Sequence, residues 1–148
     1  WFYDNYMILN RKKCEFMYLG KSKECQEYKQ FNLASKESKT LLGVIIDRNL
    51  NFTNHIVSIC KKASRKLNAL SRISNFLNYN QRYLIFNSFI QGQFNYCLLV
   101  CMFCLRSSNN KIDKIHERAL RLYENDYASS FEDLLLKTNS RKIHQKNI

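Results

Sequence analysis

The stretch NFTNHIVSICKKASRKLNALSRI, residues 51–73, has the clearest periodicity in this chain of 148 residues. Its apolar residues recur at steps of three and four, which places them on one face of a helix. We expect Thr53 or Asn54 to cap the start of that helix. The predicted core-facing residues are Ile56, Ile59, Cys60, Ala63, Leu67, Leu70 and Ile73. The opposite face carries five cations, namely Lys61, Lys62, Arg65, Lys66 and Arg72.

Helical patterns continue after residue 73, in keeping with a composition of three glycines and no proline. A second helix is predicted to start near Asn80 and to run through residues 83–90, with a break around Gly92. Residues 96–105 are apolar all round, which is typical of a helix buried in a core.

A third amphipathic helix is predicted to begin at Ser108 or Asn109. We expect Ser129 and Glu132 to form a capping box before a last helix over residues 131–136. The core stripe of the third helix consists of Ile112, Ile115, Ala119 and Leu122. Another of its faces carries Lys111, Lys114, Arg118 and Arg121, offset by the carboxylates Asp113, Glu117 and Glu124. We therefore expect this helix to attract a polyanion less than the helix over residues 51–73 does.

Strand patterns occur only before residue 51. Residues 14–19 and a short segment near residues 31–34 predict strands, and one or two helical turns are expected in residues 1–8. The strongest strand pattern is TLLGVII, residues 40–46, which is too apolar to face water on either side. The predicted fold class is α+β, with a small antiparallel β part in residues 1–50 and a mostly helical part in residues 51–148.

The charge is unevenly distributed along the chain, which has a net charge of +12. From Arg48 to Lys111 there are nine basic residues and no acidic residue. A solvated helix normally mixes both signs, because like charges repel. Attraction to a polyanion explains the imbalance, and phosphate backbones are the commonest polyanion. A general bias toward lysine in the source genome is the alternative explanation.

The sequence shows no sign of a membrane span or of secretion. The longest apolar run, residues 96–105, is half of the ~20 residues that a bilayer requires. Residues 1–9 contain Asp4 and no basic residue, unlike a signal peptide. We expect an intracellular location, in the nucleus or cytoplasm, with reduced cysteines. Because the first residue is Trp1, we also expect the chain to be a segment of a longer protein.

One cluster has spacing that suits a metal ion. Cys97, Cys101 and Cys104 share a helical face, and three thiolates with His116 can bind zinc. Buried cysteines packed as small apolar side chains explain the same spacing without a metal. We expect no metal site. The carboxylate pairs Asp113 with Glu117 and Glu132 with Asp133 lie on helices beside basic residues, and we expect them to stabilise the helices and not to act as an acid/base pair.

The order of several short segments resembles the reverse transcriptase of LINE-type (non-LTR) retrotransposons. These segments are NYM (5–7), KCEFM (13–17), LGV (42–44), KKASRKLNALSRI (61–73), QFNYC (93–97), NNKIDKIHERALRL (109–122), SSFEDLL (129–135) and IHQKN (143–147). No single segment is diagnostic, and their order and spacing carry the resemblance. The region resembled is the end of the palm and the helical thumb of an RNA-directed DNA polymerase.

The resemblance implies roles for particular residues. Lys13 occupies the position of a lysine that helps to protonate the departing pyrophosphate. Leu42 and Gly43 match the hairpin that positions the primer, and the helices after residue 50 match the thumb that grips the template–primer duplex. The implied nucleic-acid-binding residues are Leu42, Gly43, Lys61, Lys62, Arg65, Lys66 and Arg72.

The chain also departs from that family. The family's aspartates, which hold Mg²⁺ for the two-metal reaction, lie upstream of Trp1, so we expect this chain alone to be inactive and to hold no cofactor. Its expected partners are a template–primer duplex and the remaining palm and fingers, with no membrane. Residues that differ from common family residues, and that suggest a degenerate copy, are Arg11, Leu98, Cys101 and Glu124.

Two other functions remain open from the sequence. One is a free-standing basic helical protein that binds nucleic acid. The other is a protein-interaction module stabilised by zinc at Cys97, Cys101 and Cys104.

Overall fold

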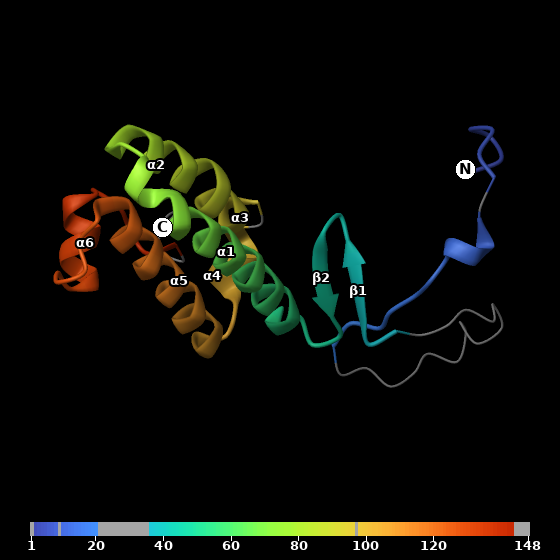
Figure 1. Cartoon of the computed structure of the whole chain (residues 1–148). Coiled ribbons are helices and arrows are strands. Elements are labelled where there is room, and N and C mark those ends of the chain that lie inside the picture. Colours follow the sequence, from blue (N-terminus) through green and yellow to red (C-terminus); the bar gives the residue numbers. More distant parts are fainter. Residues whose placement is uncertain (1, 9, 21–35, 97, 144–148) are drawn as a thin grey trace. The chain divides into compact units, whose positions relative to one another are not determined.

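The fold is that of an α+β protein, as the sequence predicts, with a two-stranded sheet and a set of helices (Figure 1). The computed structural model describes residues 2–8, 10–20, 36–96 and 98–143. The chain forms two compact units, Trp1–Asn51 and Phe52–Ile148. Within the described ranges, no helix combines the length and the apolar character needed to cross a membrane.

The sheet of the first unit is a hairpin of β1 (Ser38–Leu41) and β2 (Val44–Asp47). Leu41 pairs with Val44, so the turn consists of two residues, Leu42 and Gly43. Both have positive φ, 47° and 83°, as a type I′ turn requires. The prediction of one strand over residues 40–46 is therefore wrong, because the chain reverses where Gly43 permits a left-handed backbone. β1 is exposed along its length and β2 is half-buried, so the expected double-sided burial is wrong as well.

The start of the first unit has less regular structure than predicted. Residues 2–6 form a turn closed by a hydrogen bond from the Met7 N–H to the Phe2 carbonyl, 2.8 Å, and not a helix. Residues 14–19 contribute a single bridging residue, Phe16, whose carbonyl accepts from the Lys36 N–H. A short 3₁₀ turn, η1, spans Arg11–Lys13. The strand predicted near residues 31–34 lies outside the described residues.

The second unit begins with α1, Thr53–Ile73, the helix predicted from its periodicity. The predicted stripe is buried from Ile56 to Leu70, whereas Ile73, in the last turn, is 46% exposed. The predicted cap is wrong: Phe52 occupies the N-cap position in a left-handed conformation, and no side chain caps the helix. A 3₁₀ turn, η3, follows at Ser74–Phe76.

The second predicted helix is present as three consecutive segments, α2 (Tyr79–Ile85), η4 (Phe86–Gln91) and α3 (Gly92–Asn95). Asn78 and Gln81 form a capping box at its start, which was not predicted from the sequence. The irregularity expected around Gly92 is the π-helical turn η4, in which the Gly92 N–H donates to the carbonyl of Asn87.

The apolar run after α3 forms only a short helix, α4, Leu98–Phe103. Its burial is one-sided, because Val100 and Cys101 are buried while Leu99 is 66% exposed. The prediction of a helix buried all round is therefore wrong.

The last two helices are α5 (Arg106–Glu124) and α6 (Phe131–Lys137). α5 starts two residues earlier than predicted, after Leu105. The capping box of α6 consists of Ser130 and Asp133, and the predicted pair one residue earlier is wrong. The hydroxyl of Ser129 donates instead to Asp126, in the turn before α6.

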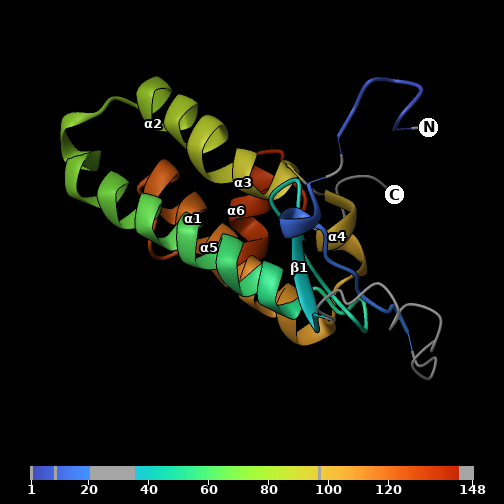
Figure 2. The ribbon, with the colours of Figure 1, turned by 90° about the vertical axis from the view of Figure 1, so that its right-hand side faces the viewer.

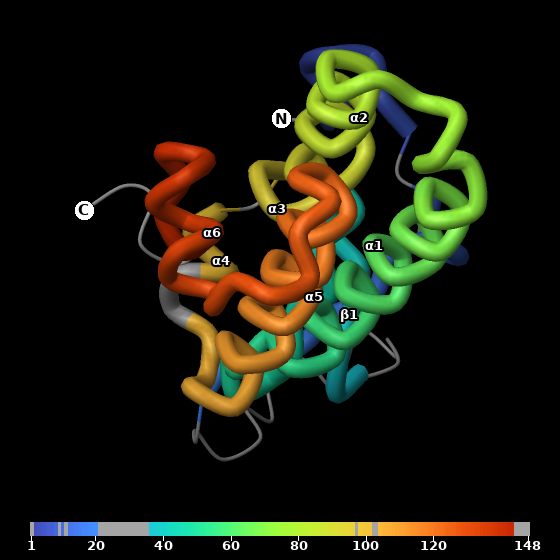
Figure 3. Tube along the Cα trace, turned by 60° about the vertical axis from the view of Figure 1, so that its left-hand side comes forward, coloured from blue at the N-terminus to red at the C-terminus, as the bar shows by residue number. Residues whose placement is uncertain are grey.

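α5 is the central helix of the second unit and packs between α1 and α6 (Figure 3). The η4–α3 segment packs along α1 (Figure 2). Fully buried side chains from all of these elements form the core: Ile56, Leu67, Ile90, Phe94, Ile112, Leu120 and Leu134. This core fixes α1 and α5 side by side, with their remaining faces available to solvent.

Candidate nucleic-acid interface

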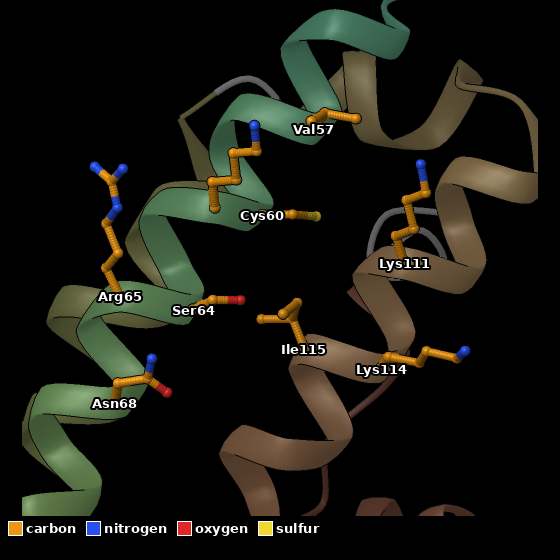
Figure 4. Close-up of a pocket in the computed structure, with 9 residues that line it drawn as sticks. Val57, Cys60, Ser64, Arg65, Asn68, Lys111, Lys114 and Ile115 are labelled. Atoms are coloured by element: carbon orange, nitrogen blue, oxygen red, sulfur yellow. The ribbon is translucent and has the colours of Figure 1, made fainter.

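An open groove of about 650 Å³ runs between α1 and α5. Cys60, Ser64 and Ile115 point toward the facing helix, while Arg65 and Lys114 extend outward from the two helices (Figure 4). The floor is thus mostly apolar, with the Ser64 hydroxyl as a polar group, and the flanks are basic. The residues lining the groove are Val57, Cys60, Lys61, Ser64, Arg65, Asn68, Lys111, Lys114 and Ile115, which include four cations and no carboxylate.

Helical spacing explains why these residues share a groove. Val57, Lys61, Arg65 and Asn68 follow one another at steps of three or four along α1, at the edge of its buried stripe. Residues at these steps lie on one face of a helix. Lys111 and Lys114 take the same position beside the buried Ile112 of α5. The groove therefore lies where two amphipathic helices meet the solvent.

Four cations, Lys61, Arg65, Lys111 and Lys114, flank the groove, and we call them the groove cations. They have no partner carboxylate among the residues that the structure describes. Uncompensated positive charge on both sides of one groove creates a field that attracts anions.

Two cations further along α5, Arg118 and Arg121, behave differently. The guanidinium of Arg118 donates to the Asn68 side chain of α1, 2.7 Å, and so links the two helices. Arg121 pairs with Glu117, 2.7 Å, and also donates to the Tyr127 carbonyl. The expectation that carboxylates offset the whole basic face of α5 holds at Arg121 and does not hold at the two groove lysines.

The floor of the groove carries no negative charge at neutral pH. Burial raises the pKa of the Cys60 thiol to about 11, although the charge of Lys111 acts in the opposite direction. The thiol is therefore protonated, and it packs as a small apolar group. Near the start of α1, burial and the charge of Lys62 lower the pKa of His55, which favours the neutral imidazole.

The structure separates the five cations that the sequence places on one face of α1. Lys61 and Arg65 line the groove, and Lys62 and Arg72 are exposed outside it. The ammonium of Lys66 donates to the Phe89 carbonyl, 3.2 Å, and lies over the Phe89 ring, 5.6 Å from its centroid. Lys66 thus joins α1 to η4.

The other predicted site residues belong to the first unit. Lys13 is exposed at the end of η1. Leu42 and Gly43 form the tip of the hairpin, and Leu42 is 83% exposed. An exposed leucine at a left-handed turn contributes little to the packing of its own hairpin.

The candidate zinc ligands lie partly within the described residues. Cys101 and Cys104 are buried, and the Cys104 thiol donates to the Asn109 side chain, 2.9 Å, and to the Cys101 carbonyl, 3.2 Å. Burial also raises the pKa of Cys104. Cys97 lies outside the described residues, which contain no group of three or more His, Cys, Asp or Glu that suits a metal ion.

Sequence reasoning missed that Lys111 and Lys114 share a site with Lys61 and Arg65. The sequence contains part of the information, because each pair of cations borders a predicted apolar stripe of its helix. What the sequence does not show is which stripes face each other.

Comparisons with known proteins find a distant relative and no family. A protein of Caenorhabditis elegans, named uncharacterized protein B0403.1, is 25% identical over 114 residues, which are 72% of this chain and 56% of the relative. The chain thus spans about half the length of that relative. No family model matches the chain, and no solved structure matches it. Fold and site define an α+β chain whose helical unit presents a basic groove.

Proposed function

We propose that the chain binds nucleic-acid duplexes by their backbone, through the groove between α1 and α5. The observation that carries this proposal is the set of four groove cations without a carboxylate among the lining residues. Phosphates dominate the affinity of proteins for nucleic acid, and Lys and Arg are their usual partners. The long side chains of both helices reach phosphates while the apolar floor accepts sugar carbons.

We expect the base sequence of the duplex to have little influence on affinity. The polar side chains that line the groove besides its cations are Ser64 and Asn68, and Asn68 already accepts a hydrogen bond from Arg118. Reading a base requires a paired donor and acceptor aimed at its edge. We therefore expect similar affinities for duplexes of different sequence.

The finer proposal is that the chain is the palm-end and thumb segment of a non-LTR retrotransposon reverse transcriptase. The resemblance of the sequence segments and the basic groove on a helical unit support it. In that context Leu42 and Gly43 contact the primer, Lys13 acts as a proton donor, and the protein works in the nucleus or cytoplasm. The two-metal reaction of that family requires carboxylates that hold Mg²⁺.

The binding proposal is tested with the full chain and a fluorescent duplex. Reversing Lys61 and Arg65 together, as Lys61→Glu and Arg65→Glu, should weaken binding about 100-fold at low salt, since two phosphate contacts are lost and two repulsions added. The matched control is Lys62→Glu with Arg72→Glu. It lowers the net charge of the chain by the same amount, at two positions of the same helix that lie outside the groove. Equal loss in both variants would contradict the groove and indicate attraction by net charge alone.

The polymerase assignment is tested separately, by primer extension. The chain alone should extend no primer with Mg²⁺ or Mn²⁺, because a proton donor without bound metal supplies only a small part of phosphoryl-transfer catalysis. Template-dependent extension above a protein-free control would show that this chain is more than the end of a palm and a thumb.

A further inference from the structure

A second hollow, of about 330 Å³, lies in the helical unit away from the groove residues. It opens between η4, the end of α5 and the segment after α6, residues 138–141. Its lining combines the rings of Tyr83, Phe86 and Tyr123 with the side chains of polar residues. The volume is at the lower end of the range for small-molecule sites.

The aromatic rings of this pocket pack against one another, and one of them is partly uncovered. The rings of Phe86 and Tyr123 are stacked, with centroids 5.8 Å apart and planes 7° apart. Tyr123 also hydrogen-bonds through its hydroxyl to Tyr79, and burial raises its pKa. Tyr83 lies 5.4 Å from Tyr123 on a tilted plane and is 49% exposed. Tyr83 therefore offers ring surface to a ligand.

Amide side chains also line this pocket, two of them on the same helical face as Tyr83. Tyr83, Asn87 and Gln91 follow at steps of four through the π-helical turn, and Asn139 comes from the segment after α6. Within the described part of the chain, the side-chain amides of Asn87, Gln91 and Asn139 make no hydrogen bond. Each such amide presents a donor and an acceptor together. That combination matches the edge of a nucleobase.

Arg141 is the one charged residue among those that line the described pocket, and no carboxylate lines it. The hydroxyls of two other lining residues already donate hydrogen bonds within the chain. Thr138 donates to the Leu134 carbonyl and Ser140 to the Thr138 carbonyl. A guanidinium at the pocket suits a phosphate, with which it forms paired hydrogen bonds.

We propose that this pocket binds a nucleotide, with its base against Tyr83 and the amides of Asn87 and Gln91 and its phosphate at Arg141. A lipid tail does not suit the polar lining, and a sugar phosphate leaves the ring of Tyr83 uncovered. The nucleotide is either free or an unpaired residue of a nucleic-acid strand. This proposal is independent of the groove, because the two sites share no lining residue.

The test is calorimetric titration of the full chain with the four nucleoside 5′-monophosphates and with the matching nucleosides. We expect binding at millimolar or lower concentration. Arg141→Gln should weaken the monophosphates about tenfold and leave the nucleosides unchanged, because only the phosphate contact is lost. Asn87→Ala or Gln91→Ala should weaken both ligand sets about fivefold, because each removes one contact to the base.

Matched controls are Asn80→Ala and Arg106→Gln, exposed residues of α2 and α5 outside the pocket, which should leave affinity unchanged. A short single-stranded oligonucleotide distinguishes the two sources of the nucleotide. If only the oligonucleotide binds and Asn87→Ala weakens it, the ligand is an unpaired residue of a strand.

Two results would overturn the assignment. One is that neither the monophosphates nor the oligonucleotide binds to the chain. The other is binding that the pocket variants leave unchanged while circular dichroism shows them folded. Reversal of Lys61 and Arg65 should not alter monophosphate binding, so failure of the groove and failure of the pocket are separable.

Discussion

The two ends of α5 carry cations in different electrostatic settings. Toward the start of the helix, Lys111 and Lys114 line the groove with no carboxylate partner in the described structure. Toward its end, Arg118 is hydrogen-bonded to Asn68 and Arg121 is paired with Glu117. The same helix thus has cations available to a ligand at one end and cations committed to the fold at the other.

This difference shows that net charge and location on a helix do not by themselves identify a binding residue. A paired arginine already satisfies its hydrogen bonds within the chain, and a phosphate has to compete with a carboxylate for it. An unpaired lysine in a groove is free of that competition. We therefore predict binding effects at the start of α5 and stability effects at its end.

Between the two ends of α5, the largest expected effect comes from neutralising its two groove lysines. Lys111→Gln with Lys114→Gln should weaken duplex binding about 60-fold near 0.1 M salt, from roughly eightfold for each phosphate contact. Arg118→Gln with Arg121→Gln is the matched control and should weaken binding less than about threefold. Fluorescence anisotropy at fixed salt measures both. A greater loss of affinity in the control would show that Arg118 and Arg121, and not the groove lysines, bind the duplex.

The second effect concerns stability after the end of α5. Ser130→Ala removes the hydroxyl that accepts from the Asp133 N–H and caps α6. The free energy of unfolding should fall by about 1 kcal/mol, as for other capping residues. Ser129→Ala tests the specificity of the cap, because that hydroxyl bonds to Asp126 and lies outside the capping box. Urea unfolding followed by circular dichroism gives both values, and a larger loss in Ser129→Ala would contradict the assigned cap.

A smaller effect is expected from the pair of Arg121 and Glu117. Glu117→Gln should lower the free energy of unfolding by about 0.5 kcal/mol, since partly exposed ion pairs contribute little. Duplex affinity should stay the same or rise slightly, because Arg121 loses its carboxylate partner. A clear fall in affinity would place Glu117 in the binding site.

The smallest effect is confined to acid. Hydrogen bonds from Lys137 and from the Ser129 hydroxyl lower the pKa of Asp126 below its usual value. A carboxyl whose pKa is lower in the folded state stabilises the fold above the unfolded pKa, near 4, and that contribution disappears as the pH falls further. Asp126→Asn should therefore melt with less dependence on pH below about 4 than the parent.

Glu132→Gln is the control for that experiment, since Glu132 is an exposed carboxylate of α6. It should keep the acid dependence of the parent. The same dependence in parent and Asp126→Asn would show that the bond to Lys137 does not stabilise the fold.

Sequence patterns predicted the helices well because amphipathic periodicity reports burial directly. The stripe of α1 from Ile56 to Leu70 is the clearest case. Helix ends were harder to predict, because the choice between Ser129 and Ser130 depends on which hydroxyl Asp126 accepts. The start of α1 has no side-chain cap at all, so no polar residue marks it.

The hairpin turn shows a different limit. Leu42 has a positive φ, which a leucine rarely adopts, so the pair Leu42-Gly43 lacks the usual composition of a two-residue turn. The apolar run around it therefore suggests one continuous strand. The reversal depends on pairing between β1 and β2, which a local pattern does not contain.

The candidate site was predicted only in part, for a similar reason. The cations of α1 were identified from charge, and Lys61 and Arg65 do line the groove. Lys66 has the same sequence signal and contacts Phe89 in η4 instead. The partners of a long cation depend on tertiary packing, so sequence alone does not separate binding residues from structural ones.

The dependence of duplex affinity on salt measures how many phosphates the groove cations contact. If the four groove cations contact four phosphates, a plot of log K against log salt for the parent should have a slope of about −4. The variant with Lys61→Gln, Arg65→Gln, Lys111→Gln and Lys114→Gln should have a slope close to zero while remaining folded by circular dichroism. A variant slope equal to that of the parent would show that cations outside the groove bind the phosphates.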